Sequence, residues 1–252
     1  MSASPGPALV TGGARRLGAA IARALAAHGH PVVIHCHHSR AEAEALAAEI
    51  RAAGGAAAII AGDLAVLSGL AALHAEAARA FGPPRLLVNN ASIFLADTIA
   101  DVTPEGFETN LAVNLAAPVL LARAFAEALP DGEDGAIVNV IDQRVLRPDP
   151  RFLSYTLAKS ALFTATKTLA QALAPRIRVN AIGPGPTLPS IHEGEAGLMR
   201  EAQGTLLGEV VDPAEIARAV LYLAAARHVT GQMIAVDSGQ HLGWRTPDTG
   251  ET

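Results

Sequence analysis

The chain contains very little cysteine, few aromatic residues and little positive charge. Its one cysteine, Cys36, excludes an intrachain disulfide framework and is expected of a protein in a reducing cytoplasm. Aromatic residues make up only 4% of the 252 residues, so the core must be built from aliphatic and small side chains. Acidic residues (24) outnumber basic ones (19), and the net charge of -5 argues against a nucleic-acid partner.

Long apolar runs are also absent. The sequence has no uninterrupted apolar run of about 18 residues, so no membrane span is expected, and Met1–Pro7 lacks the charged and apolar parts of a secretion signal. Half of the residues are nevertheless hydrophobic, which is enough for a large core. We expect one domain over residues 1–252, with its core at about residues 7–240 followed by a polar C-terminal tail.

Short apolar runs alternate with helix-like stretches along the chain. This alternation predicts an α/β fold, a single-domain Rossmann-like doubly wound parallel sheet of about seven strands with helices on both faces. The predicted strands are Ala8–Thr11, Pro31–His37, Ala57–Ala61, Leu86–Asn89, Ala136–Ile141, Arg178–Ala181 and Met233–Val236. The predicted helices are Leu17–His28, Ala41–Ala53, Leu67–Phe81, Pro104–Leu129, Tyr155–Leu173 and Pro213–Ala225.

Local signals mark two helix starts and one loop. Thr103 and Asp212 each precede a proline and are predicted N-caps, and Glu215 stands where a capping-box acid would. Residues 183–209 are rich in glycine and proline and show no sustained period. We expect this irregular segment to be a substrate loop, and a tolerated surface insertion is the alternative.

A glycine-rich turn follows the first strand, in the sequence Thr11-Gly12-Gly13-Ala14-Arg15-Arg16-Leu17-Gly18. A strand, a glycine turn and a helix together present free backbone N–H groups to a pyrophosphate. The turn therefore favours a dinucleotide site, although a tight turn that only packs helix on strand would look the same.

The end of the second strand distinguishes between the nicotinamide cofactors. It reads His35-Cys36-His37-His38-Ser39-Arg40 and lacks the acid that usually holds the ribose hydroxyls of NAD. Arg15, Arg16 and Arg40 are expected nearby, and cationic and hydroxyl donors suit a 2′-phosphate. We therefore expect NADPH. No metal is expected at the three histidines, because no carboxylate or second cysteine accompanies them, and Cys36 is interpreted as a packing residue.

Tyr155 and Lys159 are spaced by four residues and would lie on one face of a helix. A tyrosine has a pKa near 10 and is a poor acid or base at neutral pH. We expect the lysine ammonium to bring the tyrosine pKa toward the working range. Such pairs also occur on ordinary solvated helices, so the position after the fifth strand of a nucleotide-binding pattern is what makes this one significant.

Four motifs together resemble the classical short-chain dehydrogenase/reductase family in their order and spacing: the glycine turn, Asn89-Asn90-Ala91, the Tyr155–Lys159 pair and Ile177–Gly185. The resemblance covers about residues 7–240. The resemblance implies that Tyr155 donates a proton, that Lys159 modulates it, and that Asn114 holds a helix kink and a relay water. In the family the acid at Asp63 meets the adenine edge; a helix N-cap is the alternative. The residues expected at NADP(H) are Gly12, Arg15, Arg16, Leu17, His37, His38, Ser39, Arg40, Asp63, Leu64, Asn90, Ala91, Ser92, Pro184, Gly185 and Thr187.

One position departs from the common family pattern. Thirteen residues before the tyrosine, where most members have serine, this chain has Asp142. A carboxylate cannot donate a hydrogen bond to a substrate carbonyl. It suits a ring with N–H donors, or a catalytic relay of a proton to a basic nitrogen of the substrate, together with Tyr155. This departure, the Arg15-Arg16-Leu17-Gly18 turn and the Asn90-Ala91-Ser92-x-Phe94 segment resemble the pteridine reductases. In that subfamily the phenylalanine stacks the pterin on the nicotinamide, so Phe94, Ser92, Asp142 and Tyr155 are expected to bind substrate; a plain core phenylalanine is the alternative for Phe94.

The sequence thus predicts a cytoplasmic reductase that passes a hydride from NADPH to a C=N bond of a pterin or dihydrofolate-like ring. A reductase of ketones or 3-oxoacyl thioesters on the same fold is the nearest alternative, and a non-catalytic NADP-sensing protein is a more distant one. The family resemblance further implies a homotetramer. Neither a nucleic-acid nor a membrane partner is expected.

Overall fold

The computed structural model describes residues 5–190 and 192–244, so the predicted polar tail beyond residue 244 lies outside the described residues. Within these ranges seven parallel strands form one sheet in the order β3-β2-β1-β4-β5-β6-β7. Their bounds are β1 Ala8–Val10, β2 Val32–Cys36, β3 Ala57–Ala61, β4 Leu86–Asn89, β5 Gly135–Val140, β6 Ile177–Pro184 and β7 Met233–Val236. The strand order reverses between β1 and β4, which is where doubly wound folds bind ligands.

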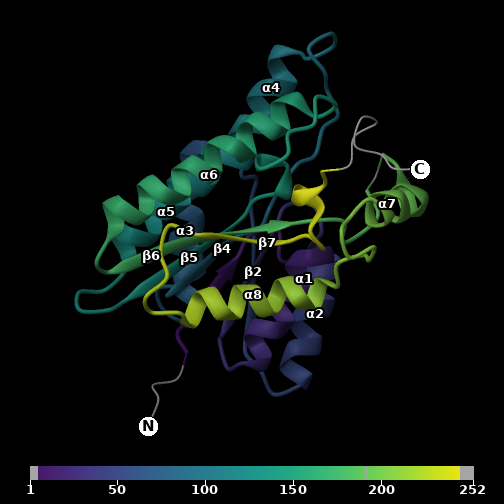
Figure 1. Cartoon of the computed structure of the whole chain (residues 1–252). Coiled ribbons are helices and arrows are strands. Elements are labelled where there is room, and N and C mark those ends of the chain that lie inside the picture. The colour runs from purple at the N-terminus through teal and green to yellow at the C-terminus, as the bar shows by residue number, and fades with distance from the viewer. Residues whose placement is uncertain (1–4, 191, 245–252) are drawn as a thin grey trace, which may run out of the picture.

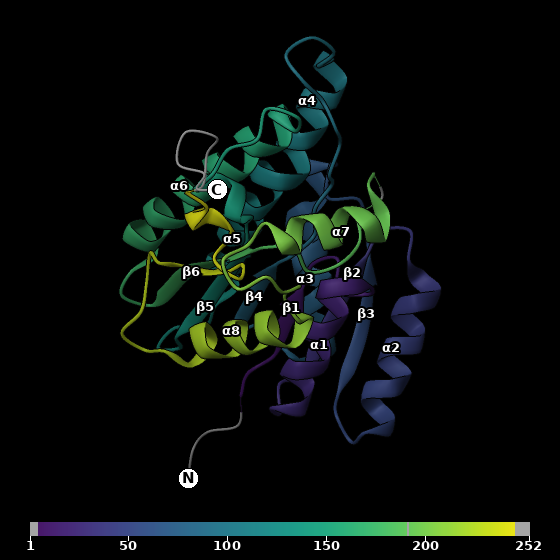
Figure 2. The ribbon, with the colours of Figure 1, turned by 45° about the vertical axis from the view of Figure 1, so that its right-hand side comes forward.

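Helices cover both faces of this sheet (Figures 1 and 2). Helices α1, α2 and α8 lie on one face, and α3, α5 and α6 lie on the other, as the predicted fold requires. Their bounds are α1 Arg16–Ala27, α2 Arg40–Ala52, α3 Leu70–Phe81, α4 Pro104–Leu111, α5 Ala117–Ala128, α6 Leu153–Leu173, α7 Gly194–Gln203 and α8 Pro213–Ala225. The core on each face is built mainly from alanine, valine, leucine and isoleucine, as the low aromatic content predicted.

The predicted helix Pro104–Leu129 is interrupted by a π-helical turn at Ala112–Ala116. By length and composition the whole stretch Pro104–Ala128 is apolar enough to cross a membrane, although the sequence has no uninterrupted apolar run. In the fold the α5 part of it packs against α3 and the sheet through Leu121 and Phe125, which are fully buried. Packing in the core therefore accounts for the apolar residues on the buried side of α5.

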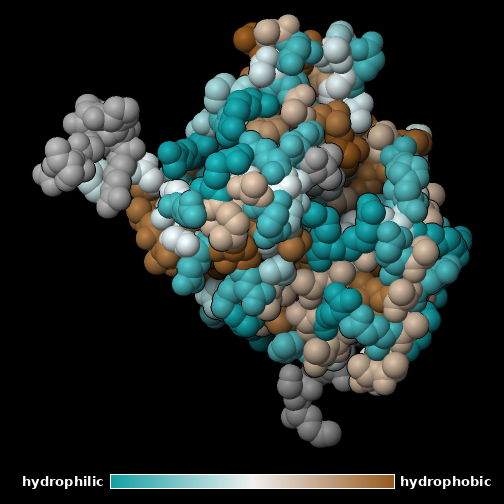
Figure 3. Space-filling model, turned by 90° about the vertical axis from the view of Figure 1, so that its right-hand side faces the viewer, coloured by the Kyte–Doolittle hydropathy of each residue, from teal (hydrophilic) through white to brown (hydrophobic). Residues whose placement is uncertain are grey.

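Two local predictions need correction. The segment 183–209 is not irregular throughout, since β6 extends to Pro184 and α7 forms a helix anchored by the buried Leu198 and Ala202. Hydrophilic residues cover much of the face on the side of α7 (Figure 3). Thr103 and Asp212 do cap α4 and α8 through their side-chain oxygens, but Glu215 pairs with Arg218 and completes no capping box.

Candidate active site

The glycine turn after β1 is held open by hydrogen bonds. Gly12 has a left-handed φ of 59°, and its N–H donates to Nδ1 of His35 at 3.1 Å. The Asn90 side-chain amide donates to the carbonyl oxygens of Thr11 (2.9 Å) and Gly12 (3.1 Å). A Cβ atom at Gly18 would lie 2.2 Å from the Gly12 oxygen, so this position accepts only glycine. Helix α1 thus begins directly after a tight glycine turn, which is the arrangement that suits a phosphate group.

Arg16 lies between the glycines of the turn, and its backbone adopts a conformation that is typical of glycine. Its φ is 53°, in the left-handed region that side chains rarely adopt. Its guanidinium donates to the carbonyl oxygen of Pro189 at 2.9 Å, so it points to the loop after β6 rather than to the end of β2. The guanidinium of Arg15 lies 3.6 Å from the carboxylate of Glu42, at the start of α2. Of the three arginines expected near a 2′-phosphate, Arg16 is therefore directed elsewhere.

The residues that follow β2 are two histidines and the start of α2. The rings of His37 and His38 lie 3.5 Å apart, and the Ser39 side chain makes no capping hydrogen bond at the first turn of α2. Arg40 is exposed and pairs with Glu44 at 3.0 Å. A helix N-terminus with a free hydroxyl, an arginine and imidazoles suits an anion, as expected for a 2′-phosphate.

His35 has a different role from its neighbours. Because Nδ1 accepts from the Gly12 N–H, Nε2 carries the proton and donates to the Gly62 carbonyl oxygen at 3.1 Å. Burial lowers the pKa of His35, so the ring is neutral and fixes the glycine turn. Among the described residues no group of three or more His, Cys, Asp and Glu side chains is placed to hold a metal ion. Cys36 is buried in the core, and burial raises the pKa of its thiol, as its interpretation as a packing residue requires.

The remaining cofactor positions lie at the ends of β3 and β6. The Asp63 carboxylate accepts from the N–H of Ala65 at 2.9 Å and closes a turn, whereas the Leu64 side chain is in the core, so only its backbone can face a ligand. A Cβ atom at Gly185 would lie 2.5 Å from Cα of Asp237, and the Thr187 hydroxyl donates to the Gly185 oxygen at 2.9 Å. Close backbone approach along this edge is what a dinucleotide needs, and the residues present fit NADP(H).

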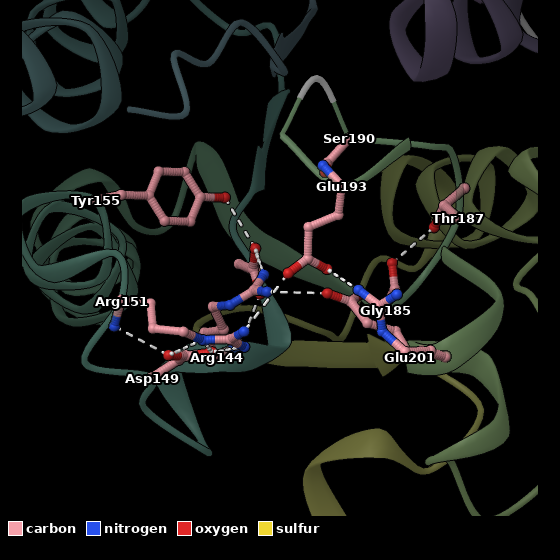
Figure 4. Close-up of polar contacts among 11 residues, drawn as sticks. Arg144, Asp149, Arg151, Tyr155, Gly185, Thr187, Ser190, Glu193 and Glu201 are labelled. Atoms are coloured by element: carbon pink, nitrogen blue, oxygen red, sulfur yellow. Dashed lines mark hydrogen bonds and ion pairs between the residues drawn. The ribbon is translucent and has the colours of Figure 1, made fainter. Parts of the chain in front are cut away.

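Tyr155, which is labelled in Figure 4, and Asp142 form the centre of the site. The Tyr155 hydroxyl donates to Oδ2 of Asp142 at 2.9 Å. Oδ1 of Asp142 accepts from the N–H of Arg144 at 2.8 Å, which begins the short helix Gln143–Val145. The Arg144 guanidinium lies 3.3 Å from Oδ2 of the same carboxylate. Asp142 is thus held by its own loop with one oxygen directed at the phenol.

The electrostatics of this pair correct one expectation. Burial and the Asp142 carboxylate raise the pKa of Tyr155 well above its usual range, whereas we expected Lys159 to lower it. The ammonium of Lys159 lies 5.7 Å from the Tyr155 ring centroid and donates to the Val140 carbonyl oxygen at 2.9 Å. Burial lowers the pKa of Lys159 to about 8, so it is charged at neutral pH. In this arrangement Tyr155 is a protonated phenol that donates a hydrogen bond to Asp142, rather than an activated phenolate.

Asn114 lies at the centre of the π-helical turn and is fully buried. Its side-chain amide donates to the carbonyl oxygen of Ile93 (3.0 Å) and to Oδ1 of Asn110 (3.1 Å), and its oxygen accepts from the Ser92 hydroxyl at 2.7 Å. The π-helical turn lies where a helix kink was expected, and Asn114 connects this turn to the segment that carries Phe94.

Phe94 belongs to an aromatic cluster beside Tyr155. Its ring stacks on Phe152 with centroids 4.2 Å apart and meets the Tyr155 ring edge-on at 4.7 Å and His192 at 5.5 Å. Arg144 lies over the cluster, 5.5 Å from the Phe94 centroid. The sequence analysis missed Phe152, His192 and Arg144. Only Arg144 carried a local signal, because it lies two residues after Asp142.

Comparison with known proteins agrees with this geometry. The family model described as enoyl-(acyl carrier protein) reductase matches residues 12–241. The structure of FolM alternative dihydrofolate reductase 1 from Brucella canis, complexed with NADP, is 49% identical, with a TM-score of 0.94 and 97% of each chain covered. A blue fluorescent protein from a metagenomic library, in complex with NADPH, is 33% identical, with a TM-score of 0.88 and 95% of this chain and 99% of that chain covered.

A curated relative extends the comparison. The 3-oxoacyl-[acyl-carrier-protein] reductase of Synechocystis is 32% identical over 238 residues, which cover 92% of this chain and 95% of the relative. The family match, the strand order and the Tyr155–Lys159 helix all agree with the resemblance seen in the sequence. The chain therefore belongs to the short-chain dehydrogenase/reductase family of oxidoreductases.

Proposed function

We propose that this chain is an NADPH-dependent reductase that transfers a hydride to a C=N bond of a pterin or dihydrofolate-like ring. The observation that carries the proposal is the hydrogen bond between Tyr155 and Asp142, because it places a carboxylate where a ketone reductase needs a hydroxyl donor. The NADP-bound Brucella alternative dihydrofolate reductase, at 49% identity, supports it. NADPH supplies the hydride when it is bound.

Residues of the chain would position the substrate and deliver the proton. Phe94 and Ser92 would position the flat ring. Asp142 would accept hydrogen bonds from the N–H donors of the ring or relay a proton with Tyr155. Tyr155 would deliver the proton, and Lys159 would compensate for the negative charge left on the phenol oxygen. Asn114 would keep the Ser92–Phe94 segment in place. We further propose that the enzyme acts in the cytoplasm as a homotetramer.

A reductase of 3-oxoacyl thioesters is the second candidate, since the Synechocystis relative is named for that activity. A turnover screen with NADPH and four acceptors separates the candidates: a dihydropterin, dihydrofolate, acetoacetyl-CoA and a simple ketone. Reduction of the two heterocycles with little reduction of the others is expected. Reduction of acetoacetyl-CoA alone would overturn the pterin proposal.

Cofactor choice gives the first prediction. We expect kcat/KM with NADPH to exceed that with NADH by at least about tenfold, because one charge-assisted contact to a 2′-phosphate is worth about 1.5–3 kcal/mol. Arg40→Ala should remove much of that preference. Arg123→Ala is the matched control, because Arg123 and Arg40 are both exposed and each pairs with a glutamate one helical turn later. Equal efficiency with both cofactors in the wild type would contradict the prediction.

The role of Phe94 gives the second prediction. Phe94→Ala is expected to raise KM for a dihydropterin about two- to tenfold more than KM for a small aliphatic ketone, since aromatic stacking adds about 0.5–1.5 kcal/mol. Phe94→Leu fills similar space without the ring and should show the same selective loss. Steady-state kinetics with both substrates measure it. An equal loss for both would mean that Phe94 only packs against Phe152.

A further inference from the structure

A cavity of about 370 Å³ lies beside the proposed ring site, between the loop after β5 and α7. We call it the arginine pocket and define it by Gln143, Arg144, Arg147, Arg151, Arg200 and Glu201. Arg144 belongs to both sites, because its guanidinium contacts Asp142 and also lies over the Phe94 ring. The pocket therefore starts where the site for the flat ring ends.

The charges that line the arginine pocket are unequal. Its lining holds four arginines but only two carboxylates, those of Asp149 and Glu201. Asp149 is held by Arg151 through a chelating contact, and Glu201 lies 3.4 Å from Arg144 (Figure 4). Both carboxylates of the lining are thus already engaged by arginines.

Arg147 and Arg200 differ in what compensates their charge. The guanidinium of Arg200 lies 3.5 Å from the carboxylate of Glu193, which compensates its charge. Arg147 donates to the Gln240 carbonyl oxygen at 3.1 Å, and no acidic side chain pairs with it in the described part of the chain. Its positive charge is therefore available to an anionic ligand.

Gln143 adds a second, independent observation. Its side chain is 4% exposed, and within the described residues its Oε1 atom is buried without a hydrogen-bond partner. A buried acceptor without a donor costs stability and is rare. Because Oε1 is also closed to solvent, an N–H group of a bound molecule would reach it only after the Gln143 side chain rotates into the pocket. The lining thus offers an acceptor oxygen for an N–H group as well as a positive charge for an anion.

We propose that the arginine pocket binds the amide and carboxylates of the benzoyl-glutamate tail of a folate-type substrate. This inference rests on the proposed function and narrows it, from pterins in general to pterins that carry an anionic tail. The tail amide N–H would donate to Gln143, and a tail carboxylate would accept from Arg147. A pterin without the tail would fill only the site at Phe94 and Asp142.

The test compares two substrates with NADPH: 7,8-dihydrofolate and 6-methyl-7,8-dihydropterin, which lacks the tail. Wild-type KM should be about tenfold lower for dihydrofolate, and Arg147→Ala should remove that ratio, as expected for the loss of one charge-assisted contact. Arg147→Lys keeps the charge and should keep most of the ratio. Arg227→Ala, an exposed arginine remote from the pocket, should leave it unchanged.

Direct binding completes the test. Titration calorimetry of the NADP⁺-loaded enzyme with 4-aminobenzoyl-glutamate should show binding that Arg147→Ala weakens about tenfold. Equal wild-type KM values for both substrates, or a ratio that survives in Arg147→Ala, would overturn the inference and leave the proposed function standing. A wild type that reduces neither substrate would overturn the proposed function and the inference with it.

Discussion

Replacement of Tyr155 by phenylalanine is expected to lower kcat by about 10²–10⁴, the usual contribution of a general acid. The ring would keep its contacts with Phe94, but the hydroxyl that donates to Asp142 would be lost. The raised pKa of Tyr155 keeps the phenol protonated at neutral pH, so its hydroxyl can donate a proton, which the phenylalanine ring cannot do. Single-turnover kinetics with saturating NADPH and dihydrofolate measure the effect.

A control separates chemistry from binding in this variant. Cofactor affinity, measured by fluorescence titration with NADPH, should remain near the wild-type value, because Lys159 keeps its position through the Val140 carbonyl oxygen. A kcat close to that of the wild type would remove Tyr155 from the mechanism. Loss of NADPH binding together with activity would point to a misfolded site instead.

Replacement of Asp142 by asparagine is expected to lower the turnover of a dihydropterin by about 10², the low end for a group that takes part in proton transfer. Asparagine keeps an oxygen that accepts from the Arg144 N–H and can still begin the helix Gln143–Val145. It removes the charge and cannot take up and return a proton. Steady-state kinetics, with thermal unfolding as the check on the fold, measure the effect.

Asp142→Ser supplies the opposite chemistry at the same position. A serine hydroxyl donates to a carbonyl oxygen, so ketone reduction should appear or improve while pterin turnover falls. The two variants together separate the two substrate classes. If both lose every activity and also melt at a lower temperature, Asp142 serves only to hold its loop, and the pterin proposal loses its main support.

The fold was largely predictable because its signals are local. Strands β3, β4 and β7 and helix α8 have the predicted bounds, since each is a continuous apolar run or a capped amphipathic stretch. Helix α7 was missed because Gly194 and Gly197 weaken its helical pattern, and only packing through Leu198 and Ala202 reveals it.

The sequence predicted that three residues of the site lie close together, but it did not predict the electrostatics of the site. The family motifs placed Tyr155, Asp142 and Phe94 together, and the structure brings them into contact. The direction of the Tyr155 pKa shift was predicted wrongly, because burial and the position of Asp142 outweigh the more distant ammonium. The positions of Arg144 and Phe152 beside Phe94 depend on how the loop after β5 folds, and the spacing of residues in the sequence does not predict this.

The π-helical turn at Ala112–Ala116 has a consequence for the two helices that it joins. A π turn holds one extra residue, so side chains on either side of it are rotated by about 100° relative to an uninterrupted helix. Asn110 before the turn can therefore reach Ser154 on α6, at 2.5 Å, while Leu121 after it faces the sheet. One inserted residue thus lets a single helix serve as a wall of the site at one end and as part of the core at the other.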